Sequence, residues 1–323
     1  DSTCVKANIH FPVDWVLLRD ATRSLLSAIK TIRAQGLKHR MPAPADLHKQ
    51  MNQLCIQMTH THRKAGSKKK RKLILRMMKK LMRVIEKHAI GYRDLLKANH
   101  DKTDWSLAQT QQVLDRIDSM LTQLPAAIDQ AHERLIGGRQ LPSGNKLISL
   151  YDRTAQIIVR GKAGCNVEFG QRLLLTEQRN GLIMDWELQG KQSQSDEKLL
   201  QITVERIHQH YGCLASIAGD RAFNSDKNDT FLDRHGIYNA TCPRNPKVLQ
   251  ERLTDPVFVE HQTRRSQSEG RIGIFKNVFL GKPLRSRILE NKRHAVNWSV
   301  LSHNLWVLGR MAIADEQSLK AAA

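Results

Sequence analysis

No run of apolar residues in this sequence approaches the roughly 20 residues that a membrane-spanning helix needs. An apolar segment typical of a signal peptide is also missing. The five cysteines are an odd number with wide spacings, and the sequence contains no CxxC pair. These absences exclude a disulfide framework and favour free thiols in a reducing compartment. We therefore expect a cytoplasmic protein with no membrane partner.

Acidic residues are scarce, with 31 Asp and Glu against 52 Lys and Arg, so the formal net charge is +21. This balance argues against an acidic enzyme for small molecules and favours a polyanionic partner, of which nucleic acid is the most obvious. Apolar residues make up 40% of the sequence, which excludes a disordered chain held open by its charge. The length of 323 residues suggests about two domains. Because the sequence starts with Asp1 and not with Met, we expect a fragment or an incomplete gene product.

The first part of the chain has the apolar periodicity of helices. After a short alternating strand at residues 1–9, the pattern predicts helices at about 16–35, 46–64, 68–98 and 103–137, the last with a bend near Pro125. Strand patterns are nearly absent here. This part therefore reads as a helical bundle or a helical insertion.

The remainder of the chain alternates between strand and helix patterns. Strands are predicted at 146–151, 168–176, 182–190, 213–220 and 237–242. Helices are predicted at 195–212, between Ser195 and Gly212, and at 225–235, 256–279 and 292–311. This order indicates an α/β domain with a mixed sheet.

Carboxylates at the ends of strands, and on a helix near the end of the sequence, are the candidate catalytic residues. Asp220 ends a buried strand, a position where α/β sheets often carry site residues. On a helix, Arg265, Glu269 and Lys276 share one face, so that a carboxylate lies between two cations. Three carboxylates converging from two strands and a helix can hold two Mg²⁺ ions, which prefer oxygen ligands. Such a pair of ions promotes phosphodiester displacement.

Several segments also resemble those of a known family, in the same order and at similar spacing. They are DSTCVKANIHFPVDW at the start, RGKAGCNVEFG, GDRAFNSDKN, SEGRIGIFKN and NWSVLSHNLWVLGR. Over essentially its whole length the chain resembles an insertion-sequence transposase of the DDE superfamily. The resemblance implies an α/β fold: an RNase H-like mixed sheet with flanking helices, plus a large all-α insertion after the first strand. The implied domains are 1–9 (first catalytic strand), 10–140 (insertion) and 141–323 (rest of the catalytic domain).

The resemblance implies that Asp1, Asp220 and Glu269 are the catalytic metal ligands. Family members often carry a Tyr-x2-Arg-x3-Glu-x6-Lys pattern around the Glu, and this chain has Gln262 at the Tyr position. Asp152 is the alternative first ligand, because it follows a predicted strand and precedes Asp220 by 68 residues. In that case residues 1–145 are an N-terminal domain. The D-S-T motif favours Asp1.

The activity implied by the resemblance is two-metal-ion hydrolysis at transposon ends, followed by in-line attack of the freed 3′-OH on target DNA. Mg²⁺ is the implied cofactor, and Mn²⁺ is the expected substitute. The expected partner is double-stranded DNA, bound by a homodimer or a larger assembly in the nucleoid of a prokaryote. The alternatives are an inactive basic DNA-binding protein derived from a transposase, and a metal-dependent nuclease without strand transfer.

Two basic regions are predicted to contact DNA phosphates. Residues 63–87 contain twelve Lys and Arg against Glu86 alone, and Leu73, Met77, Leu81 and Ile85 suggest an apolar stripe on the same helix. The second region, residues 264–293, surrounds Glu269. The predicted DNA contacts are Lys68, Lys69, Lys70, Arg71, Arg265, Arg271 and Lys276. Trp298 and Trp306 are interpreted as core residues of the last helix.

Overall fold

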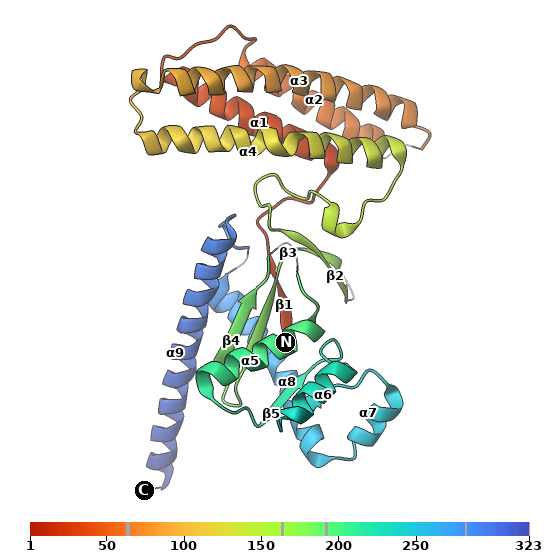
Figure 1. The fold of residues 1–323 in the computed structure, drawn as a ribbon, viewed down its shortest axis with the longest axis vertical. Helices are drawn as coiled ribbons and strands as arrows, with labels where there is room; N and C mark the ends of the chain where they lie inside the picture. Colours follow the sequence, from red (N-terminus) through yellow and green to blue (C-terminus); the bar gives the residue numbers. More distant parts are fainter. Residues whose placement is uncertain (63–64, 163–164, 191–192, 282, 323) are drawn as a thin grey trace. The chain divides into compact units, whose positions relative to one another are not determined.

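The structure is a computed structural model that describes residues 1–62, 65–162, 165–190, 193–281 and 283–322 (Figure 1). Its residues are 63% helical with small sheets, which confirms a mixed α/β protein. Contacts divide the chain into two units. The sheet unit contains Asp1–Asn8 and Thr154–Ala323, and the helical unit contains Ile9–Arg153. In the described part of the chain, no helix is both long and apolar enough to cross a membrane.

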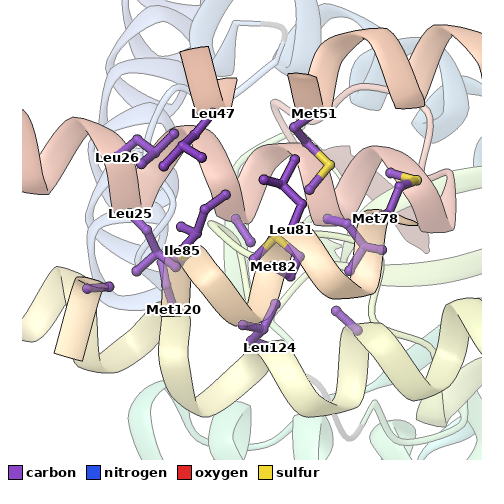
Figure 2. Packing of buried hydrophobic residues seen from close by; sticks show 14 of the residues in the cluster. Leu25, Leu26, Leu47, Met51, Met78, Leu81, Met82, Ile85, Met120 and Leu124 are labelled. Atoms are coloured by element: carbon purple, nitrogen blue, oxygen red, sulfur yellow. The ribbon is translucent and has the colours of Figure 1, made fainter. Parts of the chain in front are cut away.

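The helical unit is built on α1 (Asp14–Ala34), α2 (Pro44–His62), α3 (Lys68–Ala98) and α4 (Leu107–His132). These helices confirm the predicted elements, although α4 starts after the Ser106 cap and not near Thr103. Figure 2 shows their shared core, in which Leu25 and Met51 meet Met82 and Met120. The core is continuous because each helix carries a wide apolar stripe.

The apolar stripe predicted for α3 is wrong in its first half. Leu73 and Met77 are 57% and 47% exposed, whereas Leu81 and Ile85 are buried. A strict four-residue repeat drifts around a helix of 3.6 residues per turn, so it cannot stay on one face. The buried stripe instead follows Ile74, Leu75, Met78, Leu81, Met82, Ile85 and Ala89.

Residues 146–151 do not form the predicted strand. Leu150 packs into the helical core, and Gln130 of α4 binds the backbone of this segment by donating to the Leu147 carbonyl and accepting from the Leu147 amide. Gln123 donates to the Leu150 carbonyl in the same way. Side chains of α4 therefore satisfy peptide groups that a neighbouring strand would otherwise satisfy. The segment belongs to the helical unit, which extends to Arg153.

The sheet unit begins with β1 (Ser2–Lys6) and continues after the helical unit. Its other strands are β2 (Gln156–Lys162), β3 (Cys165–Glu177), β4 (Ile183–Leu188), β5 (Ser216–Gly219) and β6 (Tyr238–Thr241). Its helices are α5 (Asp196–Tyr211), α6 (Asp226–Arg234), α7 (Pro246–Arg252), α8 (Pro256–Ile274) and α9 (Leu289–Ala322), with a π-helical segment, η4 (Phe275–Leu280), after α8. Strand β2 and helix α7 were not predicted. The predicted helix 256–279 corresponds to α8 and η4.

Strand β3 is the centre of an antiparallel sheet. It pairs with β1 along one edge, and with β2 and then β4 along the other. Gly170 lies where β3 meets both Lys6 of β1 and Gln156 of β2. A Cβ atom at this position would lie 2.0 Å from the Val5 carbonyl oxygen, so only glycine permits this close approach.

Helices cover both faces of this sheet, because successive side chains of β3 point to opposite faces. Leu173 and Leu175 pack with Phe275 of η4 and Val296 of α9. Leu174, between them, packs in the other cluster with residues of α5 and α6. Thr3 and Asp1 lie opposite Leu173 and Leu175, so they belong to the α8–α9 face.

Strands β5 and β6 form a separate parallel pair. The described strands thus form an antiparallel sheet and a parallel pair, and not the single mixed sheet that the sequence predicted. β5 ends at Gly219, whose missing side chain leaves room for the Phe223 ring; a Cβ atom there would lie 3.1 Å from it. Asp220 follows at once. The parallel pairing brings the carboxyl ends of both strands to one edge of this small sheet.

The prediction that Trp298 and Trp306 are core residues is wrong. They are 68% and 40% exposed. Helix α9 packs on the sheet unit through Val296, Val300 and Val307, which are buried. Trp298 falls outside that face, and Trp306 lies at its edge beside Phe279 and His303. Helical position, and not hydrophobicity alone, decides which side chains meet the sheet.

Candidate active site

Asp1 lies beside β3 at the start of β1. Its backbone nitrogen donates to the Leu175 carbonyl, and its carbonyl accepts from the Leu175 amide. The Asp1 side chain is only 10% exposed, and its Oδ2 atom is buried with no hydrogen-bond partner among the described residues. A buried, unpartnered carboxylate oxygen is costly unless a cation or a donor compensates it, so this atom marks a candidate binding position.

One guanidinium nitrogen faces two of the predicted ligands. Nη1 of Arg265, on α8, lies 3.7 Å from Oδ1 of Asp1 and 3.6 Å from Oε1 of Glu269. Glu269 is one helical turn after Arg265, and its side chain is 64% exposed. The structure thus brings Asp1 and Glu269 to the same cation, although they are 268 positions apart.

Asp220 follows β5 and closes a tight turn, in which its Oδ1 accepts from the Ala222 amide at 2.8 Å. Burial lowers the pKa of the Asp1 amino group, while the Asp220 carboxylate is the strongest of the charges that raise it. Asp220 therefore acts on the Asp1 amino group more strongly than Asp196 and Glu177 do.

The other two predicted cations of this helix bind protein groups. Arg271 lies 3.1 Å from Glu177, the last residue of β3. Lys276, in η4, donates to Oγ1 of Thr3 at 3.0 Å. Sequence reasoning missed both partners, Thr3 and Glu177. The two-residue period of β1 was the available signal for Thr3, since it places Thr3 on the same face as Asp1.

Asp152, the alternative first ligand, belongs to the helical unit. It is 2% exposed, and its backbone amide donates to Oγ of Ser149. Asp1, Asp220 and Glu269 all belong to the sheet unit.

A cavity of about 530 Å³ lies beside the pair formed by Asp1 and Arg265. Its lining includes Asp1, Glu177, Gly219, Arg265 and Arg271. Charged groups of both signs therefore border a concave space at the carboxyl end of β5. Clefts bordered in this way are the usual place for a polar substrate or a cation.

The donor set here consists of carboxylate oxygens, which suit Mg²⁺ or Mn²⁺. The orphaned Oδ2 of Asp1 fits such an ion. Among the described residues, no group of three or more His, Cys, Asp and Glu side chains is already gathered closely enough to hold a metal. The arrangement is thus two carboxylates on one guanidinium, with Asp220 acting on the amino group of Asp1.

The basic helix α3 lies in the helical unit. Lys68, Lys69 and Lys70 are exposed and Arg71 is partly buried. Further along the helix, Arg76, Lys80, Arg83 and Lys87 are exposed. The cations therefore cover the side of α3 that does not enter the helical core.

Comparison of the chain with protein-family models, with curated proteins and with solved structures finds no match.

Proposed function

We propose that this chain carries the RNase H-like catalytic domain of a DDE transposase, with the helical unit inserted after β1. The motif resemblance is the first support. The order of elements in the sheet unit is the second: three strands, β1, β3 and β4, pair antiparallel, and a helix and two parallel strands follow. A helical unit that enters the chain directly after β1 agrees with this topology.

The observation that carries the proposal is the position of Arg265 between Asp1 and Glu269. Two carboxylates that face one cation form a centre that favours positive charge. Asp220 carries a further negative charge, which acts on the amino group of Asp1. We assign the first ligand to Asp1, since it belongs to the same unit as Asp220 and Glu269, unlike Asp152.

Asp1, Asp220 and Glu269 are the residues that would hold Mg²⁺ ions at this centre. Bound there, the ions would supply activation of the attacking oxygen and stabilisation of the leaving oxygen. The backbone of Asp1 is held by β3, and its carboxylate lies 3.7 Å from Arg265. Glu269 is exposed on α8 and can turn toward the centre without unpacking a core.

The basic side chains of the protein have a separate role in this mechanism, which is to bind DNA phosphates. Arg265 and Lys276 both reach β1, at Asp1 and Thr3, and so lie along the strand that carries the first carboxylate. A scissile phosphate that enters beside Asp1 meets their positive charges, which orient it and offset its negative charge. The exposed cations of α3 provide a second surface for the DNA backbone.

The test is cleavage and joining of DNA by the purified chain with Mg²⁺ or Mn²⁺. The substrates are a supercoiled plasmid and a labelled duplex with a free 3′-OH end. We expect metal-dependent nicking of the plasmid and joining of the labelled end to it. Asp220→Asn and Glu269→Gln should each lower both activities at least about a hundredfold, because each removes a charge at the reacting centre. Glu290→Gln is the matched control, since Glu290 is an exposed residue of α9 whose carboxylate lies 3.5 Å from Arg293.

The same experiment separates the alternatives. Nicking without joining indicates a nuclease that performs no strand transfer. Binding of DNA with no metal-dependent cleavage indicates an inactive DNA-binding protein. Cleavage that survives both Asp220→Asn and Glu269→Gln contradicts the proposed site.

A further inference from the structure

Gln262 connects three parts of the sheet unit. From α8, its Nε2 atom donates to the Ala240 carbonyl of β6 at 2.6 Å and, more weakly, to the Gly219 carbonyl of β5 at 3.5 Å. Its Oε1 atom accepts from Nε of Arg265 at 3.3 Å. One glutamine therefore links the carboxyl ends of two parallel strands to the guanidinium that faces Asp1 and Glu269.

This linkage restricts the orientation of Arg265. The guanidinium group is planar, so a bond at Nε fixes the plane in which Nη1 lies. Nη1 is the atom that lies 3.7 Å from Asp1 and 3.6 Å from Glu269. With its side chain only 23% exposed, Arg265 is held between its partners more firmly than a surface arginine would be.

The chemistry of glutamine matters for this connection. A glutamine amide has two hydrogens to donate and an oxygen that accepts, so it can serve two carbonyls and one arginine at once. A tyrosine hydroxyl, which the resembling family often carries at this position, has a single hydrogen. The contacts of Gln262 are thus a property of this chain's own sequence.

We propose that Gln262 positions Arg265 between Asp1 and Glu269, so that the guanidinium neutralises these carboxylates in the metal-free protein and competes with a divalent cation for them. This inference rests on the proposed metal site. Arg265 occupies the side of Asp1 that carries Oδ1, while the buried Oδ2 has no hydrogen-bond partner in the described part of the chain. A cation that binds both Asp1 and Glu269 must therefore draw at least one of them away from Arg265.

Arg265 and a divalent cation compete for the two carboxylates because both carry positive charge. The Asp1 carboxylate is only 10% exposed, so it needs a positive partner when no metal is present. A divalent cation and Arg265 cannot both occupy the space between the same two carboxylates. Removing Arg265 should therefore strengthen metal binding and weaken the metal-free fold.

The first experiment measures Mn²⁺ binding, by the electron paramagnetic resonance signal of the free ion, in the full chain and in Arg265→Gln. We expect the variant to bind Mn²⁺ about tenfold more tightly, because a positive charge within 4 Å of both carboxylates is lost. Arg264→Gln is the matched control. It removes the same charge from the adjacent position of α8, where Arg264 donates to the Arg179 carbonyl. We expect a change of no more than about twofold there. Arg264 lines the same cavity, but among the described residues it is Arg265 that lies within 4 Å of both carboxylates.

The second experiment tests whether Gln262 acts through Arg265. Gln262→Leu should tighten Mn²⁺ binding by about threefold, because Arg265 keeps its charge but loses its fixed orientation. Gln267→Leu, an exposed position on the same helix, is the control and should leave binding unchanged. In the Arg265→Gln background, Gln262→Leu should have no further effect on Mn²⁺ affinity. A merely structural role for Gln262 would instead give the same change in both backgrounds.

A measurement without metal completes the test. In EDTA, Arg265→Gln should have a lower melting temperature than the unmodified chain, and saturating Mn²⁺ should restore more of the stability of the variant than of the unmodified chain. Mn²⁺ affinity that depends on Asp220 but is unchanged or weaker in Arg265→Gln overturns this inference and leaves the proposed function standing. Mn²⁺ binding that is absent from the unmodified chain, or indifferent to Asp220→Asn, overturns both.

Discussion

Lys276 donates a hydrogen bond to Oγ1 of Thr3 at 3.0 Å, which joins η4 to the strand that carries Asp1. Thr3 is 7% exposed and lies two positions after Asp1 on the same face of β1. Arg265 and Lys276 thus meet successive inward-facing residues of one strand. This relationship fixes α8 and η4 on β1 at two points.

Replacing Thr3 by valine tests the second of these points. The substitution keeps the shape of the side chain but removes the hydroxyl that accepts from Lys276, so we expect a loss of about 1–2 kcal/mol in the free energy of unfolding. Urea unfolding of the full chain measures it. Thr3→Ser is the control, because it keeps the hydroxyl and loses only a methyl group. A Thr3→Val protein as stable as the unmodified chain would show that the bond contributes nothing.

Gln130 provides a second prediction, in the helical unit. Its side chain donates to Asp14 and to the Leu147 carbonyl and accepts from the Leu147 amide. Gln130→Leu removes the partner of the Leu147 amide and carbonyl, whereas Asp14 keeps its ion pair with Arg134. We expect a loss of about 2–4 kcal/mol. Hydrogen exchange of residues 146–151 should accelerate in parallel. Gln111→Leu, on the exposed side of α4, should change stability by less than about 0.5 kcal/mol.

The same contacts explain where prediction from the sequence succeeded and failed. The helices of the first part and the order of elements after Ser195 follow from apolar period and capping residues, which are local signals. Residues 146–151 have the composition of a strand, but the side chains of Gln123 and Gln130 decided their conformation. These glutamines lie on another element, α4, so the local sequence pattern of residues 146–151 does not show their contacts. Tertiary contact therefore overrode strand propensity.

The candidate site shows a similar division. Asp220 and the pair of Arg265 and Glu269 were identified from strand ends and helical spacing, and their roles remain predictions. The contacts of Gln262 were not predicted, because they join α8 to carbonyl groups of β5 and β6. Backbone carbonyls are present at every position, so the sequence cannot indicate which of them a side chain will reach.

His303 gives a prediction about pH. It is 2% exposed and packs against Phe279 and Trp306, and burial lowers its pKa from the usual 6.5, although a contact with Asn304 acts in the opposite direction. The unfolded chain therefore binds a proton at His303 more readily than the folded chain does. The contribution of His303 to stability is complete above pH 6.5 and is lost as the pH falls from 6.5 toward the folded pKa.

Melting temperatures measured from pH 5 to pH 8 test this sign. His303→Phe should flatten the decline of stability on the acid side of pH 6.5, because phenylalanine takes no proton. His210→Gln, at an exposed position of α5, is the control and should leave the slope unchanged. A slope that is equally steep in His303→Phe would assign the pH dependence to other groups.

The basic face of α3 leads to a prediction about salt. Lys68, Lys69 and Lys70 are exposed at the start of the helix. If each of them neutralises one DNA phosphate, replacing all three by glutamine should reduce the slope of log K against log salt concentration by about 3 × 0.9. Fluorescence anisotropy with a labelled duplex of arbitrary sequence, at several salt concentrations, measures this slope.

The control for α3 removes the same total charge elsewhere on the helical unit. Lys30, Lys49 and Lys97 are exposed on α1, α2 and the far end of α3, and their joint replacement by glutamine preserves the net charge of the test variant. For this variant, we expect the slope of log K against log salt concentration to stay near that of the unmodified chain. Charges are screened beyond about 8 Å at physiological salt. Equal reductions of the slope in both triple variants would show that DNA binding depends on the overall charge of the protein. A reduction confined to the variant at Lys68, Lys69 and Lys70 would show that the start of α3 contacts the DNA backbone.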